Sequence, residues 1–312
     1  MRAIICGSFA YDNIMVFGDK FSNHILPDKI NLLNVSFLVP HLRKEFGGCA
    51  GNIAYNLKKI GGDPIPVGTV GEDFDPYRKW MVELDVNNEY VTQVPTTYTA
   101  QAFITTDTDN NQITAFHPGA MDFSNINDLK SMGDAEIGII SPDSKEGMLA
   151  HAKQMADLKI PFIFDPGQGM PMFDGEELTQ LIELADWVSV NEYEAEVMEK
   201  KTEMNSSGIT KLVEAYIVTK GARGATIYSS EGPVEIPPAT VGKVVDPTGC
   251  GDAFRAGLLY GLCNNFDLPK LGRLSSVLGA IKVGSKGTQN HSISRDSVEN
   301  IYRVSFGEKL LW

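Results

Sequence analysis

The stretch VDPTGCGDAF, residues 245–254, carries the pattern that decides the local fold and the chemistry expected of this chain. Two glycines, Gly249 and Gly251, form a turn with little side-chain bulk, and an apolar helical pattern begins at Ala253. Backbone N–H groups of such a turn can converge on a phosphate, and the helix N-terminus adds about half a positive charge at the same place. We therefore predict an anion-binding turn at the start of a helix.

A carboxylate, Asp252, directly follows the second glycine. An acid among anion-binding amides repels phosphate unless it has a chemical role, and the obvious role is to take a proton from a hydroxyl that attacks the phosphate. We interpret Asp252 as a general base, with the amides of Gly249, Cys250 and Gly251 as an anion hole. The glycine pattern alone leaves a simpler alternative open, a tight strand-to-helix connection.

The composition limits the class of protein. With 312 residues, of which 43% are hydrophobic, the chain can bury a large core, either as one big domain with an appendage or as two modest domains. The formal net charge is -13, and no stretch concentrates Lys or Arg residues. These features argue against nucleic acid or an anionic membrane surface as the main partner.

Nothing in the sequence predicts export or a membrane span. The apolar run at residues 3–10 is short, is followed at once by Asp12 and lacks a credible cleavage site, so we expect a strand there and not a signal peptide. No segment approaches transmembrane length. The cysteines show neither a CxxC pair nor zinc spacing, so we expect reduced thiols in a cytoplasmic protein. They are Cys6, Cys49, Cys250 and Cys263.

Short β-rich runs alternate with amphipathic segments along most of the chain. The expected strands are residues 3–6, 64–70, 137–141, 162–165, 187–190, 216–219 and 225–228. The expected helices include residues 145–157, 175–184 and 192–200. Such alternation predicts an α/β fold whose mostly parallel sheet is covered by helices on both faces.

Two segments, residues 17–46 and 98–117, break this alternation because neither contains a helical pattern. The first includes an apolar, β-rich run at residues 30–39, and the second has two β-rich runs around a hairpin turn signal at residues 107–111. Together they predict a small sheet that projects from the main domain. We therefore expect two domains. The large α/β domain comprises residues 1–16, 47–97 and 118–312, and the small β domain comprises residues 17–46 and 98–117.

The motifs resemble those of the ribokinase-like (PfkB) carbohydrate and nucleoside kinases. DPTGCGD at residues 246–252 resembles the family signature DTxGAGD, and its departures, Pro247 and Cys250, leave the glycines and the acid in place. GGCAGNIA at residues 47–54 resembles the second signature. The resemblance spans essentially the whole chain. It implies a three-layer αβα core, a small β-sheet lid over the acceptor substrate, and phosphoryl transfer from ATP.

Residues near the predicted acceptor site suit a ribose. Asp12 follows the first strand at the edge where open α/β folds bind ligands. Gly47 and Gly48 let a polyol approach the backbone, and Asn52 can both donate and accept hydrogen bonds. A sugar and a nucleoside fit this set equally well. The alternatives are a turn or helix-cap role for Asp12 and a hinge role for the glycines.

Finer resemblance favours a nucleoside. The segments GSFAYD, VSFLV, FDPGQ and GDAFRAG, which begin at residues 7, 35, 164 and 251, resemble the bacterial ribokinase-like adenosine kinases. The resemblance implies that the ribose is held by Ser8, Asp12, Ser36, Gly48 and Asn52, and the adenine by Phe103, Phe116 and Gln168. Gly169 departs from relatives that carry a second Gln. Aromatic residues can stack on a purine, although packing within the small sheet is an alternative role for them.

The residues expected to bind ATP are inferred from the same resemblance. The residues concerned are Asn191, Thr219, Gly221, Gly224 and Asn290. Asn191 and Glu194 match the Asn-x-x-Glu motif and would organise Mg²⁺ through its waters, while Asn191 also suits a helix cap. Many relatives use K⁺, whereas the residues themselves give no independent sign of a monovalent cation site.

The sequence thus predicts a kinase that transfers phosphate from ATP to the 5′-hydroxyl of adenosine, giving AMP in purine salvage. A kinase for ribose, another sugar or a different nucleoside remains an alternative, and so does a catalytically silent sensor. In several relatives two subunits pair through the lid, whereas others are monomeric, so the resemblance leaves a homodimer through the lid and a monomer as alternatives.

Overall fold

The computed structural model describes residues 2–25, 34–109 and 111–312. Within these residues nine strands form one large sheet in the order β13-β12-β11-β10-β9-β8-β1-β4-β5. They are β1 (Arg2–Cys6), β4 (Asp63–Val70), β5 (Val91–Gln93), β8 (Ile137–Ile140), β9 (Phe162–Phe164), β10 (Trp187–Asn191), β11 (Ala215–Thr219), β12 (Ala225–Ser229) and β13 (Gly232–Ile236). Only the pairs β11–β12 and β12–β13 are antiparallel among them. The predicted mostly parallel sheet is confirmed.

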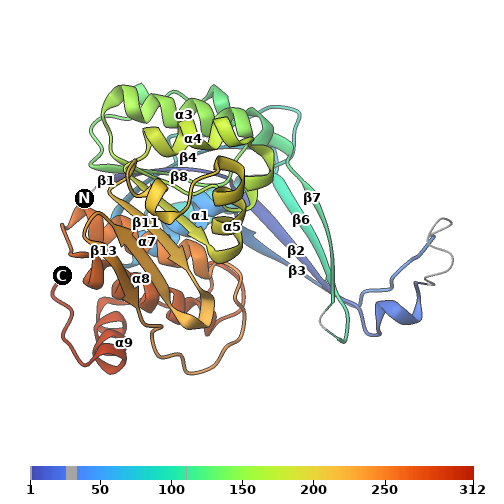
Figure 1. The fold of residues 1–312 in the computed structure, drawn as a ribbon. Helices are drawn as coiled ribbons and strands as arrows, with labels where there is room; N and C mark the ends of the chain where they lie inside the picture. The colour runs from blue at the N-terminus through green and yellow to red at the C-terminus, as the bar shows by residue number, and fades with distance from the viewer. Residues whose placement is uncertain (1, 26–33, 110) are drawn as a thin grey trace.

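Helices cover both faces of this sheet, as Figure 1 shows for α3 and α4 on one face and α7 and α8 on the other. One layer contains α1 (Cys49–Lys59), α2 (Asp75–Glu83), α7 (Cys250–Cys263), α8 (Leu268–Val283) and α9 (Arg295–Phe306). The other contains α3 (Lys145–Leu158), α4 (Gly175–Leu184), α5 (Glu192–Thr202) and the short α6 (Ser206–Ile209). Successive side chains of a strand point to opposite faces. Ile5 of β1 accordingly packs in the first layer and Ile4 in the second. The three-layer αβα core is confirmed.

The predicted helices begin at polar caps. Ser144 caps α3, and Asp174 and Asn191 form capping boxes at the starts of α4 and α5. Such caps satisfy N–H groups that lack partners within the helix. Short 3-10 helices occupy several connections: η1 (Phe21–Asn23), η3 (Gly119–Ile126), η4 (Leu129–Ser131), η5 (Gly167–Met172) and η6 (Gly221–Arg223).

A second, four-stranded sheet extends away from the main body (Figure 1). Its order is β3-β2-β6-β7, with β2 (Ala10–Val16), β3 (His41–Gly47), β6 (Ala100–Thr106) and β7 (Gln112–His117). β6 and β7 form the predicted antiparallel hairpin; Asn110, within its predicted turn, lies outside the described residues. The predicted small sheet is therefore present.

Two details differ from the sequence expectation. Residues 10–16 were expected in the large domain, yet they form β2 in the middle of the small sheet. Only residues 7–9 separate β1 from β2, so no break in composition marks the change of sheet. The β-rich run expected at residues 30–39 is not a strand over residues 34–39, and residues 30–33 lie outside the described residues. The strand begins instead at His41, after Pro40, and its polar composition suits an edge strand.

None of the helices in the described part of the chain is both long enough and apolar enough to cross a membrane.

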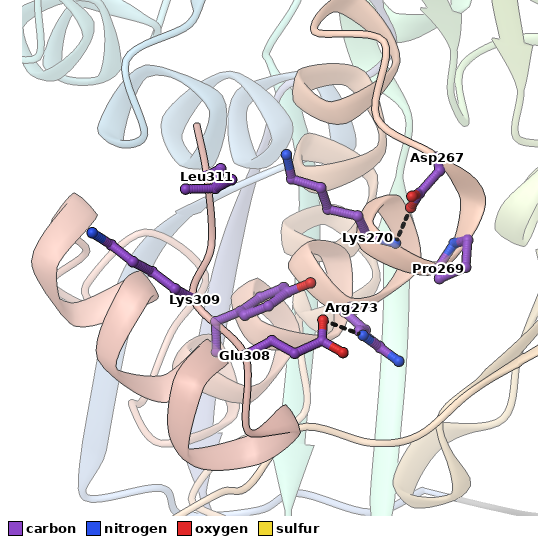
Figure 2. A pocket seen from close by; sticks show the side chains of 8 residues that line it. Asp267, Pro269, Lys270, Arg273, Glu308, Lys309 and Leu311 are labelled. Carbon is purple, nitrogen blue, oxygen red and sulfur yellow. Dashed lines mark hydrogen bonds and ion pairs between the residues drawn. The ribbon is translucent and has the colours of Figure 1, made fainter.

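A hollow lies at the N-terminal end of α8 (Figure 2). It is lined by Asp267, Pro269, Lys270, Arg273, Tyr302, Glu308, Lys309 and Leu311. Arg273 forms an ion pair in this hollow, since its Nη1 lies 2.7 Å from Glu308 Oε2. The predicted phosphate-binding turn packs against the opposite end of α8, so this hollow is separate from it.

Candidate active site

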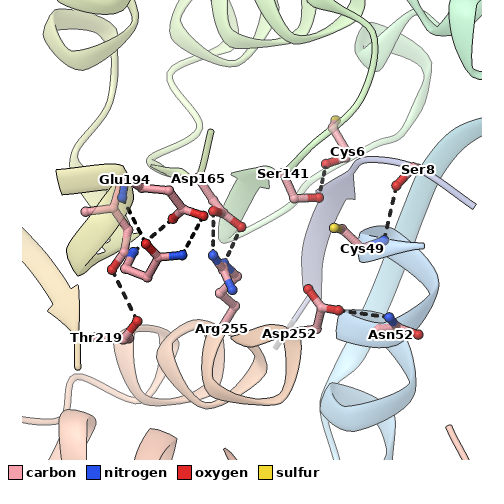
Figure 3. A network of polar contacts seen from close by, with 12 residues as sticks. Cys6, Ser8, Cys49, Asn52, Ser141, Asp165, Glu194, Thr219, Asp252 and Arg255 are labelled. Atoms are coloured by element: carbon pink, nitrogen blue, oxygen red, sulfur yellow. Dashed lines mark hydrogen bonds and ion pairs between the residues drawn. The ribbon is translucent and has the colours of Figure 1, made fainter. Parts of the chain in front are cut away.

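The predicted site residues gather where parallel strands of the large sheet end. Ser8 follows β1, Asn191 ends β10 and Thr219 ends β11. Asp165, which was not predicted, follows β9 at the same edge. Figure 3 shows Ser8, Asp165, Glu194, Thr219 and Asp252 around the first turns of α7. Open α/β folds bind ligands at this edge, because the loops that follow parallel strands diverge there. The local sequence and the topology therefore place the candidate site residues at one edge of the large sheet.

The predicted anion turn precedes α7 as expected. Gly249 has a φ of 79°, a left-handed conformation that favours glycine, and α7 begins at Cys250. The amide of Cys250 donates to Pro247 O at 3.1 Å, so the fold already uses this member of the predicted anion hole. The amides of Gly249 and Gly251 have no hydrogen-bond partner within the described part of the chain. Of the predicted anion hole, the amides of Gly249 and Gly251 are therefore available to an anion.

Asp252 lies in the first turn of α7 and is buried. Its Oδ2 accepts a hydrogen bond from Asn52 Nδ2 at 2.8 Å (Figure 3). Burial raises the pKa of Asp252 above its ordinary value, while the Arg255 charge and the Asn52 donor oppose the rise. A buried carboxylate with a raised pKa beside free amides suits a general base.

Asn52 was expected to contact a ribose, but both ends of its amide are already engaged. Its Nδ2 holds Asp252, and its Oδ1 accepts from Gln289 Nε2 at 3.0 Å. Gln289 in turn accepts from Trp80 Nε1 at 3.0 Å and contacts the Tyr77 hydroxyl. Tyr77 and Gln289 were not identified from sequence, because residues so distant along the chain meet only after folding. Asn52 therefore positions Asp252 in this structure.

The other expected acceptor residues do come together. A Cβ atom on Gly47 would lie 2.6 Å from Asp12 Oδ2, and one on Gly48, whose φ is 86°, would lie 2.5 Å from Ser8 O. Burial raises the pKa of Asp12 to about 6, and the Asp252 carboxylate adds to the rise. Gly48 fits only as glycine, because its φ is positive and a Cβ atom would collide with backbone, whereas a Cβ atom at Gly47 would displace the Asp12 carboxylate. Asp12 also lies within electrostatic range of the proposed base.

The two phenylalanines expected at the base lie on opposite faces of the small sheet. Phe116 pairs with Ala102, which pairs with Asp12, so Phe116 shares the face of Asp12. Phe103 pairs with Asn13 and lies on the other face. Their exposed fractions are 53% for Phe116 and 42% for Phe103. One chain therefore cannot direct both rings at the same base, contrary to the sequence expectation.

Ser36 also lies apart from the other acceptor residues. It is exposed, and the neighbouring Phe37 packs on Phe17 and Phe21, with ring centroids 4.8 and 5.1 Å away. Phe17 directly follows Val16, the last residue of β2, so this cluster lies beyond the far end of the strand that carries Asp12. The structure therefore does not bring Ser36 to the site within one chain.

Gln168 lies at the C-terminal edge of the large sheet and is exposed. Gly167, with a φ of 45°, begins the η5 turn directly after Pro166, and Gln168 follows it. Gly169, the position of the departure from relatives, is buried. The amide of Gln168 is therefore accessible to a ligand.

Arg255 and Asp165 form a buried ion pair that was not identified from the sequence. Arg255 Nη2 donates to Asp165 Oδ1 at 2.7 Å, and Arg255 Nε pairs with Asp165 Oδ2. Burial raises the pKa of Asp165 to about 7, and the Arg255 charge counteracts the rise. A Cβ atom on Gly251 would collide with Arg255 Nη1. The Arg255 guanidinium thus lies directly beside the anion turn. The only feature of the sequence that could have indicated this pair is that Arg255 is a charged residue within the apolar run of α7.

The Asn-x-x-Glu motif forms a capping box. Glu194 Oε2 accepts from Asn191 N at 2.8 Å, and Asn191 Oδ1 accepts from Glu194 N at 2.9 Å. Asn191 Nδ2 also donates to Glu194 Oε1 at 2.7 Å. No group of three or more His, Cys, Asp or Glu residues in the described ranges could hold a metal ion. Both carboxylate oxygens of Glu194 are therefore engaged within the capping box, and the expected water-mediated contact of Asn191 and Glu194 with Mg²⁺ stays a prediction.

The expected ATP residues occupy the neighbouring strand ends. Thr219 Oγ1 donates to Val190 O at 3.3 Å. Gly221 and Gly224 have φ values of 55° and 85°, and a Cβ atom at Gly224 would collide with Ile236 O, whereas the position of Gly221 is open. Asn290 Nδ2 donates instead to Glu45 Oε2 of β3 at 2.7 Å. Thr219, Gly221 and Gly224 thus share one edge, while Asn290 contacts the small sheet.

Two amides without partners in the described residues and a buried carboxylate lie at the edge of an αβα sheet, next to a small second sheet, an arrangement that suits phosphoryl transfer. The sequence pattern of the pfkB family carbohydrate kinases matches residues 12–295, and this chain belongs to that family.

Several relatives share both sequence and fold with the chain. The nucleoside kinase of Methanocaldococcus jannaschii is 34% identical over 268 residues, which cover 85% of this chain and 88% of that protein. The structure of Burkholderia thailandensis nucleoside kinase in complex with inosine is 48% identical, has a TM-score of 0.90, and covers 98% of this chain and 99% of its own. The same kinase has been solved in complex with ADP-inosine, with a TM-score of 0.87, 49% identity, and coverage of 98% of this chain and 97% of its own.

Proposed function

We propose that this protein is an ATP-dependent nucleoside kinase that phosphorylates the 5′-hydroxyl of purine nucleosides, adenosine among them, to give the 5′-monophosphate. The observation that carries the proposal is the buried Asp252 carboxylate, held by Asn52 at 2.8 Å directly behind two amides without partners. The full-length similarity to nucleoside kinases supports a nucleoside as the acceptor.

In the proposed reaction Asp252 accepts the proton of the 5′-hydroxyl as its oxygen attacks the γ-phosphorus of ATP. The amides of Gly249 and Gly251 and the helix N-terminus stabilise charge on the transferred group, and the Arg255 guanidinium beside them adds a positive charge. Glu194, with Asn191, would hold the waters of a bound Mg²⁺, and the ion would supply positive charge that neutralises the phosphates. Water is excluded when the small sheet closes over the acceptor, which limits hydrolysis of ATP.

The acceptor is recognised in two parts. Asp12, with Ser8 and the backbone at Gly47 and Gly48, binds the ribose diol, because the carboxylate accepts hydrogen bonds from neighbouring hydroxyls. Phe116 stacks on the base from the same face of the small sheet. Adenosine and inosine differ only at the purine 6-position. The inosine complexes of the Burkholderia kinase therefore favour a kinase that accepts both over one restricted to adenosine.

Initial rates with ATP and Mg²⁺ across adenosine, inosine, cytidine, ribose and fructose test this proposal, with Asp252→Asn as the control for contaminating kinases. We expect kcat/KM to be highest for a purine nucleoside. A preference for ribose or fructose over every nucleoside would instead identify a sugar kinase. No transfer to any acceptor would leave the sensor alternative.

We also propose that the small sheet pairs two copies of the chain. Among the residues that the structure describes, β3 and β7 are its open edges, and the sheet exposes apolar side chains. These are Val16, Leu42, Phe103, Ile113 and Phe116. Exposed edges and apolar patches favour pairing. Light scattering decides the matter: a monomer at all concentrations would contradict the dimer, and would leave the kinase proposal intact.

A further inference from the structure

The side chain of Lys282, near the end of α8, is completely buried, with an exposed fraction of 0%. Lysine is almost never buried unless its ammonium is paired. Lys282 Nζ donates to two backbone carbonyls, Asp246 O at 2.8 Å and Ser285 O at 3.1 Å. Within the described residues, no carboxylate oxygen lies within ion-pairing distance of it. The ammonium is thus held by carbonyl oxygens, as a dehydrated K⁺ ion is in a protein site.

The two carbonyls belong to the loops that form the anion turn. Asp246 begins the turn that leads to Gly249, and Ser285 belongs to the loop after α8. Further bonds join these loops: Asp246 Oδ2 accepts from Gly287 N and Asp246 Oδ1 from Thr248 N, both at 3.0 Å. The backbone amides of Val245 and Asp246 donate to the Val283 carbonyl, at 2.8 and 3.1 Å. Lys282 therefore lies behind the anion turn and connects its two supporting loops.

The charges near Lys282 favour its protonated form. Burial lowers the pKa of Lys282, and the nearby Cys250, Asp246 and Asp252 groups oppose that fall. Cys250 and Asp252 both belong to the first turn of α7. A positive charge at this point favours phosphate at the amides of the same turn.

We propose that Lys282 is a positioning residue that acts as a built-in monovalent cation for the anion turn. Its ammonium holds the carbonyl of Asp246, and so orients the amides of Gly249 and Gly251 toward the transferred phosphoryl group. The inference rests on the kinase function proposed above. Because the ammonium already occupies the space between the carbonyls of Asp246 and Ser285, the wild-type enzyme requires no added K⁺.

The experiment compares wild type with Lys282→Met and Lys282→Ala, using Lys270→Met on the same helix as a matched control. Turnover is measured at saturating ATP and Mg²⁺ in tetramethylammonium, ammonium or potassium chloride. We expect wild type and the control to be indifferent to the cation. Lys282→Met should lose about tenfold to 100-fold in kcat, less than or comparable to the loss of an anion-hole donor itself.

The decisive result is rescue. Lys282→Ala leaves room for a small cation, so K⁺ or ammonium should restore about tenfold of its kcat, whereas tetramethylammonium is too large to enter. Marked K⁺ stimulation of wild type, full turnover of Lys282→Met, or a folded Lys282→Ala that no cation rescues would each overturn the proposal.

Thermal unfolding gives a readout that is independent of activity. A cation that binds only the folded Lys282→Ala variant must raise its Tm. We therefore expect K⁺ to raise the Tm of Lys282→Ala and not that of wild type. If wild type phosphorylates no acceptor while this Tm difference persists, the kinase proposal fails, and the positioning role fails with it, but the occupation of a cation site by Lys282 stands. If the Tm difference is absent, the cation site itself is contradicted.

Discussion

Asp252 and Asp12 are two buried or partly buried carboxyls that lie within electrostatic range of each other, and both have raised pKa values. Their surroundings differ. Asp252 has a neutral donor, Asn52, and the nearby charge of Arg255. Asp12 has the carboxylates of Asp252 and Glu45 near it. These different environments are consistent with the different roles proposed above, proton transfer for Asp252 and hydroxyl binding for Asp12.

Replacing Asp252 with Asn should lower kcat by about 10² to 10⁴, the usual contribution of a general base. The side chain keeps its size and the acceptor site is unchanged, so nucleoside binding measured by calorimetry should be retained. Unaltered thermal unfolding would exclude a folding defect. Should the variant keep more than about a tenth of wild-type turnover, Asp252 is not the base.

Nucleoside affinity should fall as the pH falls through about 6, where Asp12 takes up a proton. The carboxylate form accepts two hydroxyl hydrogen bonds, and the protonated form accepts less well. Calorimetric Kd values for adenosine between pH 5 and 8 measure this effect. The Asp12→Asn variant serves as the control, with weak binding that no longer changes over this range. An unchanged pH dependence in that variant would assign the titration to another group.

At the scale of elements, the alternation of side chains along β6 and β7 decides which aromatic ring shares a face of the sheet with Asp12. Phe116 shares the face of Asp12, and Phe103 has the opposite face. The two residues resemble each other in type, exposure and strand context. They therefore form a matched pair for an experiment.

Phe116→Ala should weaken adenosine binding by about 1 to 3 kcal/mol, the range for base stacking on an aromatic side chain. Phe103→Ala should leave binding by one chain nearly unchanged. Ribose, which has no base, should bind both variants as it binds wild type. Equal losses for adenosine and ribose would show that Phe116 serves only in packing. A large loss from Phe103→Ala would place that ring at the site, through a partner copy.

At the scale of the whole molecule, the ion pair between Arg255 and Asp165 joins the turn that carries Gln168 to the helix that carries Asp252. The two residues are 90 positions apart. The pair thereby connects a candidate base-reading segment to the catalytic turn. A pair of this kind costs desolvation, and breaking it leaves one buried charge uncompensated.

Arg255→Met should lower the free energy of unfolding by about 3 to 5 kcal/mol near neutral pH, because Asp165 stays buried without its partner. In the variant, the folded-state pKa of Asp165 lies further above its unfolded value. Its folded state then binds more protons than the unfolded state between these two pKa values, and stability falls as the pH rises. Urea unfolding at pH 5 and pH 8 measures this. Adding Asp165→Asn should recover much of the loss, and a double variant no more stable than Arg255→Met would contradict the role of the pair.

Local patterns in the sequence determined the alternating core, the hairpin and the anion turn. The seven predicted strands and three predicted helices are present, and Gly249 has the left-handed conformation that its turn requires. Such features depend on neighbours within a few residues, through side-chain periodicity, caps and backbone freedom. The resemblance of residues 246–252 and 47–54 to kinase signatures added the family, which the comparison over residues 12–295 confirms.

Tertiary structure alone decided which distant residues meet. Asn52 reaches Asp252 across 200 positions, and Gln289 reaches Asn52 across 237. Lys282 lies behind the anion turn for the same reason, since α8 packs along α7 and returns to it. The membership of β2 in the small sheet and the opposite faces of Phe103 and Phe116 follow from strand order and register. Order and register are set by contacts between segments, and no pattern within one segment contains them.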